Sequence, residues 1–336
     1  MSLNNSKRVM FGKLWKTLKF FIIIGIVLIC LPHSILPKQT SDIKKDDLEN
    51  YVKLNNNESR LAEYKDDEEA LKLKLRQLEI INNSRKRYNA GAVRLDILAS
   101  RVANKMCSEA AENNFLGHWN LAGEKPYHRY AFAGGYDHVS ENAFGEWSSD
   151  NYVISSSNIS SMMKAGHGTF MAEKPPYDGH KKNITEKSHN FVGIGYYISG
   201  KQFRYYEEFL DRYFEYEDIP AEVGIDEPFH ITVNTKGETY LYYLVVYRED
   251  FPELLTPAQI SSKGSYEDFA DEQYLRMAAW DMAGIRRGSE YIIPLKFSKE
   301  GLYYIQIFAD KKEITAPSSV NTMGKTPYSG IVIKVK

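Results

Sequence analysis

Apolar side chains recur with helical spacing in the first part of the chain. Leu71, Leu75, Leu78 and Ile81 follow one another at intervals of three or four residues, which predicts a helix with one face packed on a core. The helix should end near Asn89-Ala90-Gly91, because turn-forming residues gather there.

Two more helices are predicted further along. Leu98 and Val102 share one face of a helix expected over about 95–112. A third helix is expected over about 157–172, and Lys174-Pro175-Pro176 ends it, because proline cannot continue a helix.

Alternation of apolar and polar positions replaces helical spacing beyond Phe191. Runs at 191–197 and 202–206 flank Ile198-Ser199-Gly200-Lys201, which is typical of a β-hairpin. Further alternating runs, rich in Ile, Val and Tyr, follow from Tyr216 onward, and they cover 229–233, 239–247, 291–297, 302–309 and 331–335. A helical insert is predicted between Tyr266 and Ala283.

These patterns predict an α+β chain with two folded domains. Residues 76–215 mix helices and strands without βαβ repetition, whereas residues 216–336 are typical of an all-β sandwich of the immunoglobulin-like kind. The densely charged residues 38–75 are interpreted as a solvated tether that becomes helical. Residues 1–37 form a separate segment, and a chain of 336 residues has room for all four parts.

The first segment has the form of an export signal. Residues 1–19 carry five basic side chains and no acidic one, and Phe20–Leu31 is an uninterrupted apolar run. About 12 apolar residues suit a signal peptide, since a spanning helix usually needs about 20. No small-x-small cleavage pattern follows Leu31, so a cleaved signal peptide and an uncleaved signal anchor both stay open. Either one places the remaining chain outside the cytoplasm, and the second also attaches it to the membrane.

Charge and cysteine content narrow the class of protein. The net charge of −1 argues against a nucleic-acid binder that depends on phosphate contacts. Of the two cysteines, Cys30 lies in the export segment, so Cys107 has no partner for an internal disulfide. Cys107 stands among alanines on the predicted second helix, and we expect it to be a small buried hydrophobic residue.

Six of the eight histidines lie between His118 and His189. Histidine is both a metal ligand and a proton carrier near neutral pH, so a histidine cluster with nearby glutamates is the first candidate for chemistry. His128 and His138 stand near predicted loops and are expected at the surface.

Short motifs between Leu78 and Phe209 resemble, in order and spacing, those of the CAP superfamily of SCP-like proteins (cysteine-rich secretory, antigen 5 and pathogenesis-related proteins). The motifs are Asn82-Asn83-Ser84-Arg85, Arg94-Leu95-Asp96-Ile97-Leu98-Ala99, Phe115-Leu116-Gly117-His118, Arg129 with Ala133-Gly134-Gly135, Glu141-Asn142, and Gly179-His180-Lys181-Lys182-Asn183-Ile184. The lack of an internal cysteine pair makes the chain more similar to the disulfide-free bacterial members.

The resemblance implies a three-layer α-β-α sandwich for the first domain, with two histidines and two glutamates converging in a groove. His118, Glu141 and His180 match three members of this tetrad. Glu173 matches the fourth through an aromatic-x-x-Glu pattern, with Phe170 in place of the usual tryptophan. His167, His189 and Asn183 are further candidates: His167 belongs to a second Gly-His pair, and His189 directly precedes a predicted strand.

The chemistry of this residue set suits a divalent cation such as Zn²⁺. His118 and His180 would bind the ion through neutral imidazole nitrogens, and the glutamates would hold the outer ring nitrogens. Two protein ligands leave coordination positions open for water or a ligand. The same four groups could instead act as an acid–base pair.

Three classes of function follow. The first is an extracytoplasmic CAP binding module whose groove holds a divalent cation and a small apolar ligand, because sterol and fatty-acid binding are implied by the resemblance. The second is a metal-dependent hydrolase, either a peptidase or a cell-wall enzyme. The third is a surface adhesion protein that binds a cell-surface or cell-wall component through exposed sandwich tyrosines, of which the candidates are Tyr240, Tyr242, Tyr303 and Tyr304. Enzymatic activity is left undecided and a binding role is favoured, since the chain has no Gly-x-Ser-x-Gly or His-Glu-x-x-His motif.

Overall fold

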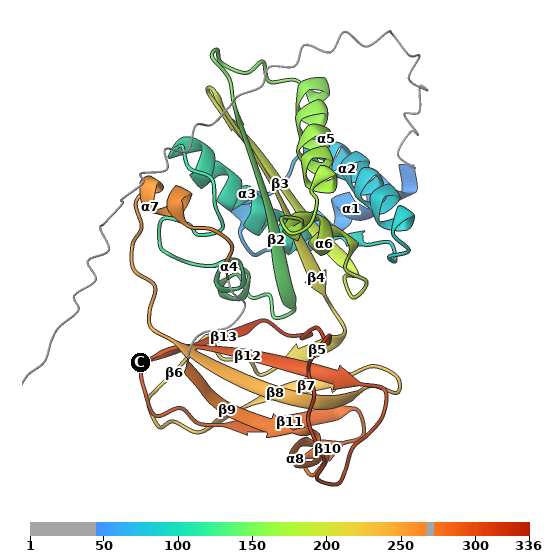
Figure 1. Cartoon of the computed structure of the whole chain (residues 1–336), viewed down its shortest axis with the longest axis vertical. Coiled ribbons are helices and arrows are strands. Elements are labelled where there is room, and N and C mark those ends of the chain that lie inside the picture. The colour runs from blue at the N-terminus through green and yellow to red at the C-terminus, as the bar shows by residue number, and fades with distance from the viewer. Residues whose placement is uncertain (1–44, 267–271) are drawn as a thin grey trace, which may run out of the picture. The chain divides into compact units, whose positions relative to one another are not determined.

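The computed structural model describes residues 45–266 and 272–336, and the predicted export segment lies outside this range. In the described residues the chain is α+β, with eight α-helices and three mostly antiparallel sheets (Figure 1). Among the helices described, none is long and apolar enough to cross a membrane.

The first sheet has the strand order β1-β3-β4-β2. Its strands are β1 (Arg94–Leu95), β2 (His138–Trp147), β3 (Phe191–Ser199) and β4 (Gln202–Asp211). Strand β1 runs parallel to β3, and the other pairs are antiparallel. The predicted hairpin is confirmed, because β3 and β4 pair from Phe191–Leu210 to Ser199–Gln202 across a turn in which Gly200 has a φ of +56°.

Helices cover both faces of this sheet (Figure 1). Helix α3 (Ile97–Glu112) packs on one face beside Tyr206. Helices α2 (Glu68–Arg87) and α5 (Ser156–Ala172) pack on the opposite face beside Tyr205. All three predicted helices are confirmed, and Cys107 of α3 is buried as expected.

Part of the segment interpreted as a solvated tether is folded. Helix α1 (Lys45–Asn57) turns Leu48 and Tyr51 toward the core beneath α2, and the 3₁₀ turn η1 (Ala62–Tyr64) follows it. Lys74 forms a buried ion pair of 2.7 Å with Asp66. The charged composition of the segment did not predict this packing, because α1 buries few residues and its charged side chains are exposed.

The C-terminal strands form two sheets, with the orders β10-β11-β7-β5 and β6-β13-β12-β8-β9. The strands are β5 (Phe214–Glu217), β6 (Glu222–Val223), β7 (Phe229–Thr235), β8 (Tyr240–Glu249), β9 (Glu272–Ala278), β10 (Arg286–Arg287), β11 (Glu290–Leu295), β12 (Gly301–Asp310) and β13 (Ile331–Val335). One hydrophobic cluster draws Ile231 and Ile293 from the first of these sheets and Val246 and Ile305 from the second. The five predicted runs therefore correspond to β7, β8, β11, β12 and β13.

The predicted helical insert at 266–283 is wrong over most of its described length. Residues Glu272–Ala278 form β9, which pairs antiparallel with β8, and only Ala279–Ala283 are helical, as α8. Tyr274, Leu275 and Met277 join the hydrophobic cluster from this strand. Residues 272–278 form their backbone hydrogen bonds by pairing with the edge of β8. This pairing makes the segment a strand, because its own sequence pattern does not distinguish a helix from a strand.

The C-terminal strands contact the first sheet's helices through α4 (Pro126–Phe132). Tyr127 stacks on Tyr304 of β12 at 4.1 Å between ring centroids, and its hydroxyl donates to Glu249 of β8. His128 is buried in the same contact, and His138 is buried at the start of β2, so their predicted surface positions are wrong. Both histidines are covered by segments that are distant in sequence.

The segment between β8 and β9 also returns to the first sheet. Its helix α7 (Pro257–Ser262) lies near α3 (Figure 1), and Ile260 is buried against Cys107 and Phe115. A few residues later the segment brings Tyr266 beside His118, with 5.1 Å between the ring centroids.

Candidate functional site

A groove of about 520 Å³ gathers most of the predicted site residues. Strand β2 supplies Ser140, Glu141 and Asn142, and the turn after α3 supplies His118. The remaining lining residues come from the connection between α5 and α6 (Gly179–Thr185), from α6 itself and from the β8–β9 segment, and they include Glu173, Tyr177, His180, Asn183 and Tyr266.

His118 is held from two sides. Its Nδ1 lies 2.8 Å from Oε1 of Glu141, and its backbone carbonyl accepts a hydrogen bond from Arg129. Arg129 also forms an ion pair with the second oxygen of Glu141. Burial, together with the nearby Arg129 guanidinium, lowers the pKa of His118 to about 4. His118 is therefore neutral at pH 7 and its Nε2 is available as a ligand.

Glu208 stands behind this pair and was not among the predicted site residues. It lies beside Arg129 on β4, in register with Glu141 on β2, and its side chain is buried. Burial and the neighbouring Glu141 carboxylate raise the pKa of Glu208 well above its usual value. Glu208 therefore holds a proton at neutral pH, while Glu141 is paired with Arg129.

His180 repeats the arrangement on the opposite side of the groove. Its Nδ1 lies 2.5 Å from Oε1 of Glu173, and its backbone N–H donates to the other oxygen of that carboxylate at 3.0 Å. Phe170 packs on the ring at 4.7 Å between centroids. The rings of His118 and His180 lie 6.3 Å apart, so the four residues of the predicted tetrad do converge.

Ser140, His189 and Asp211 resemble a nucleophile, a base and an orienting acid, but their hydrogen bonds do not suit that role. Nδ1 of His189 lies 3.0 Å from Asp211, and Nε2 lies 3.0 Å from Oδ1 of Asn183 but 3.4 Å from the Ser140 hydroxyl. The hydroxyl donates instead to Oδ1 of Asn183 at 2.6 Å.

The orientation of the Asn183 amide follows from its neighbours. Asn142 donates through Nδ2 to Glu207 and to the His180 carbonyl, so its oxygen accepts from Nδ2 of Asn183. Oδ1 of Asn183 must then face His189 and Ser140. Both ring nitrogens of His189 consequently point at oxygen acceptors, and neither is free to take a proton from Ser140.

His167 lies away from the groove. It is buried on α5, where Nδ1 contacts Glu207 at 2.8 Å and Nε2 contacts the Ser84 hydroxyl at 2.9 Å. This network satisfies the ring completely, so the second Gly-His pair serves packing. Asn183 lines the groove. His189 is buried behind Asn183, and its Nε2 lies 3.0 Å from the Asn183 side-chain oxygen.

Sequence reasoning missed Glu208 and Tyr266. Glu208 follows Glu207 in a strand whose other side chains are largely apolar or aromatic, and an acidic pair in such a strand is a signal that could have been used. Tyr266 carries no local signal. Its hydroxyl accepts from the Glu141 backbone N–H at 3.0 Å, although 125 residues separate the two.

The donor set fits a cation only in part. Within residues 45–266 and 272–336, no three His, Cys, Asp or Glu side chains are close enough to hold a metal ion together. Two imidazoles with carboxylates on their outer nitrogens do match the outer-shell pattern of histidine metal ligands. Water or a bound ligand would have to complete the coordination.

Comparison with known proteins gives limited similarity. No family model and no curated protein matches the chain. An extracellular protein with an SCP domain from Bacillus anthracis is 17% identical, with a TM-score of 0.32 over 41% of this chain and 40% of that one. An outer surface protein from Borrelia burgdorferi is 15% identical, with a TM-score of 0.32 over 42% and 92%. The chain thus spans less than half of the B. anthracis protein.

Proposed function

We propose that this protein is an extracytoplasmic CAP-type binding protein whose groove takes a divalent cation through His118 and His180. The observation that carries the proposal is the pairing of each imidazole with its own carboxylate at Nδ1, in Glu141 and Glu173. This pairing directs the Nε2 atoms away from the carboxylates and selects the tautomer that binds a metal.

The CAP-type assignment rests on the motifs and on where they fold. Six motifs in family order bring four side chains from separate elements to one groove. Helices on both faces of the β1-β3-β4-β2 sheet agree with the three-layer arrangement that the resemblance implies. The basic flank and apolar run at the N-terminus support an exported protein, with the attachment to a membrane still open.

The lining of the groove favours a polar ligand over a lipid. Histidine, glutamate, asparagine, serine and tyrosine side chains make up most of it. A sterol or fatty acid would need a wide apolar wall, since ligand sites bury most of the ligand surface. A bound cation beside these donors suits a ligand with oxygen atoms that complete its coordination.

Of the two other predicted functions, the metal-dependent hydrolase stays an alternative, because a cation in the same groove could activate a water molecule. A hydrolase that relies on a protein nucleophile is disfavoured, because the Ser140 hydroxyl donates to Asn183 and burial raises the pKa of the Cys107 thiol well above its usual range. Adhesion through exposed tyrosines is disfavoured, because Tyr242, Tyr303 and Tyr304 are buried.

Zinc titration of the full chain by calorimetry tests the proposal. We expect His118→Ala and His180→Ala each to abolish binding, and Glu141→Gln to weaken it by about 10-fold to 100-fold, because an outer-shell partner tunes its ligand. His230→Ala is the matched control, since its side chain is 54% exposed on β7. Binding that survives both groove variants would remove the cation from the proposal, provided circular dichroism shows them to be folded.

A further inference from the structure

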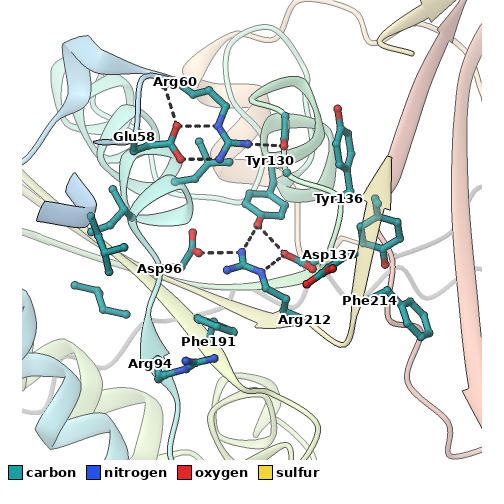
Figure 2. Close-up of a pocket in the computed structure, with 18 of the residues that line it drawn as sticks. Glu58, Arg60, Arg94, Asp96, Tyr130, Tyr136, Asp137, Phe191, Arg212 and Phe214 are labelled. Atoms are coloured by element: carbon teal, nitrogen blue, oxygen red, sulfur yellow. Dashed lines mark hydrogen bonds and ion pairs between the residues drawn. The ribbon is translucent and has the colours of Figure 1, made fainter. Parts of the chain in front are cut away.

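A second cavity, larger than the groove, lies at the end of the first sheet where β3 begins and β4 ends. It has a volume of about 880 Å³ and is formed where the loop after α1, the start of α3, the α4–β2 loop and the β4–β5 connection meet (Figure 2). None of the tetrad residues lines it. Its volume falls within the range of sites for small ligands.

Arg212 forms the rigid centre of this cavity. It bonds to Asp96 at 2.9 Å, to Asp137 at 2.8 Å and to the Tyr130 hydroxyl at 3.1 Å (Figure 2). The Tyr130 hydroxyl in turn donates to Asp137 at 3.1 Å. These mutual bonds hold planar polar groups in place before any ligand arrives, which reduces the entropy lost on binding.

Phe191 lies between two guanidinium groups (Figure 2). The guanidinium carbon of Arg212 is 4.4 Å from the ring centroid, and that of Arg94 is 4.3 Å away. Arg94 is exposed and forms no ion pair with any residue that the structure describes. Its charge is therefore positioned by the aromatic ring yet unpaired at the mouth of the cavity.

The rim adds a second fixed pair and an aromatic wall. The Arg60 guanidinium donates two hydrogen bonds to Glu58 and one to the Gly134 carbonyl. Tyr136 and Tyr216 stand opposite, with their rings edge to face at 6.2 Å. Both rings line the cavity, so a ligand meets flat aromatic surface beside groups that donate and accept hydrogen bonds.

The charged side chains that line the cavity indicate which class of ligand it can bind. Three arginines line the cavity together with four carboxylates, those of Glu58, Asp96, Asp137 and Glu215. A multiply charged anion such as a phosphate would be repelled by this lining. A molecule rich in hydroxyl groups fits it, because each hydroxyl both donates to a carboxylate and accepts from a guanidinium. One carboxylate on such a molecule would pair with Arg94.

We propose that this cavity binds an acidic oligosaccharide, with sugar rings on the Tyr136 wall, hydroxyls on the Arg212 network and a sugar carboxylate on Arg94. The site is separate from the cation groove and does not depend on it. An acidic peptide is the competing ligand, but beyond its backbone it has few groups that both donate and accept hydrogen bonds, as sugar hydroxyls do.

Calorimetry of the full chain tests the proposal with three probes: a short galactan oligomer that ends in one galacturonate residue, a neutral galactan oligomer of equal length, and an end-blocked peptide with one glutamate. We expect the acidic oligosaccharide to bind about tenfold more tightly than the neutral one, because a charge-assisted hydrogen bond adds to shared contacts. Arg94→Gln should abolish this difference. Arg76→Gln, an exposed arginine on α2, is the matched control and should leave it intact.

His180→Ala should leave oligosaccharide binding unchanged, which separates this site from the groove. Three outcomes would overturn the proposal: no oligosaccharide binds, the acidic preference survives in Arg94→Gln, or the peptide with one glutamate binds as tightly as the acidic oligosaccharide. The last result would show that Arg94 binds any carboxylate and that the cavity does not recognise a sugar.

Discussion

At the scale of single residues, the groove depends on which carboxyl groups carry protons. Glu141 pairs with His118 and Arg129, whereas Glu208 is buried, lies 3.7 Å from the same Arg129 guanidinium and has a strongly raised pKa. A neutral acid next to a paired carboxylate avoids two adjacent buried charges. Burial raises the pKa of Glu141 too, and Arg129 opposes that rise. A proton on Glu208 would favour an ionised Glu141 that orients His118.

Glu208→Gln and Arg129→Gln should have opposite effects on stability. The raised folded pKa means that Glu208 favours the folded state below pH 4.5 and that this contribution is lost as pH rises, because the unfolded chain ionises freely. Relative to the wild type, Glu208→Gln should thus become more stable as the pH rises from 4.5 to 7. Arg129→Gln should lose about 3–5 kcal/mol, since it leaves a buried charge unpaired.

Urea denaturation at several pH values measures both effects. Equal losses in the two variants, or a Glu208→Gln difference that does not change with pH, would contradict a protonated Glu208.

At the scale of elements, α3 and β3 approach each other closely through small residues. A Cβ added at Gly195 would lie 2.3 Å from the backbone carbon of Ala103, and one at Gly193 would lie 2.4 Å from that of Ala99. Residues with side chains at these positions would push α3 off the sheet. The turn after α3 holds His118, so this packing also sets the position of one wall of the groove.

Gly195→Ala should therefore destabilise the protein by about 3 kcal/mol, because the clash is with backbone that cannot move aside. Gly168→Ala is the matched control: Gly168 is exposed in the middle of α5, and an added Cβ meets nothing within 4 Å. That change should stabilise by about 0.5–1 kcal/mol through helix propensity. Thermal unfolding followed by circular dichroism compares them, and similar effects at both sites would argue against close packing at Gly195.

At the scale of the whole described unit, Glu249 ties the C-terminal strands to α4. It accepts from Lys125 at 3.0 Å and from the Tyr127 hydroxyl. Burial raises the pKa of this carboxyl, but its contacts with His128, Lys125 and Tyr127 outweigh burial and lower the pKa to about 2. The contact between α4 and β8 is therefore strongest when Glu249 is ionised.

Acid should weaken this contact. A lowered folded pKa gives stability that is present above pH 4.5 and is lost as pH falls toward 2, and the full effect is about 3 kcal/mol. Glu249→Gln should lose that amount at pH 7 and show a flatter acid dependence than the wild type. Glu238→Gln, at an exposed position, should behave as the wild type in chemical denaturation between pH 2 and 7. A parallel acid dependence in wild type and Glu249→Gln would refute the role of this contact.

The sequence by itself determined the local elements and the tetrad. Spacing of three or four residues predicted α2, α3 and α5, and alternation predicted β3, β4 and most C-terminal strands, because each pattern reflects the geometry of a single element. The tetrad was predictable because His118, Glu141, Glu173 and His180 stand in short motifs of fixed order. The division into domains of residues 76–215 and 216–336 and the role of any metal stay predictions.

Only the tertiary structure decided which distant segments meet. It placed Tyr266 beside His118, buried His128 under β8, and turned 272–278 into a strand along an open edge. It also brought Arg212, Asp96 and Asp137 together around a cavity that none of the sequence motifs predicted. Local patterns record the contacts that a residue makes with its near neighbours in the chain. Burial, shared protons and cavities depend on contacts between segments that are distant in the chain, such as Glu141 and Tyr266, which are 125 residues apart. Local patterns do not record such contacts.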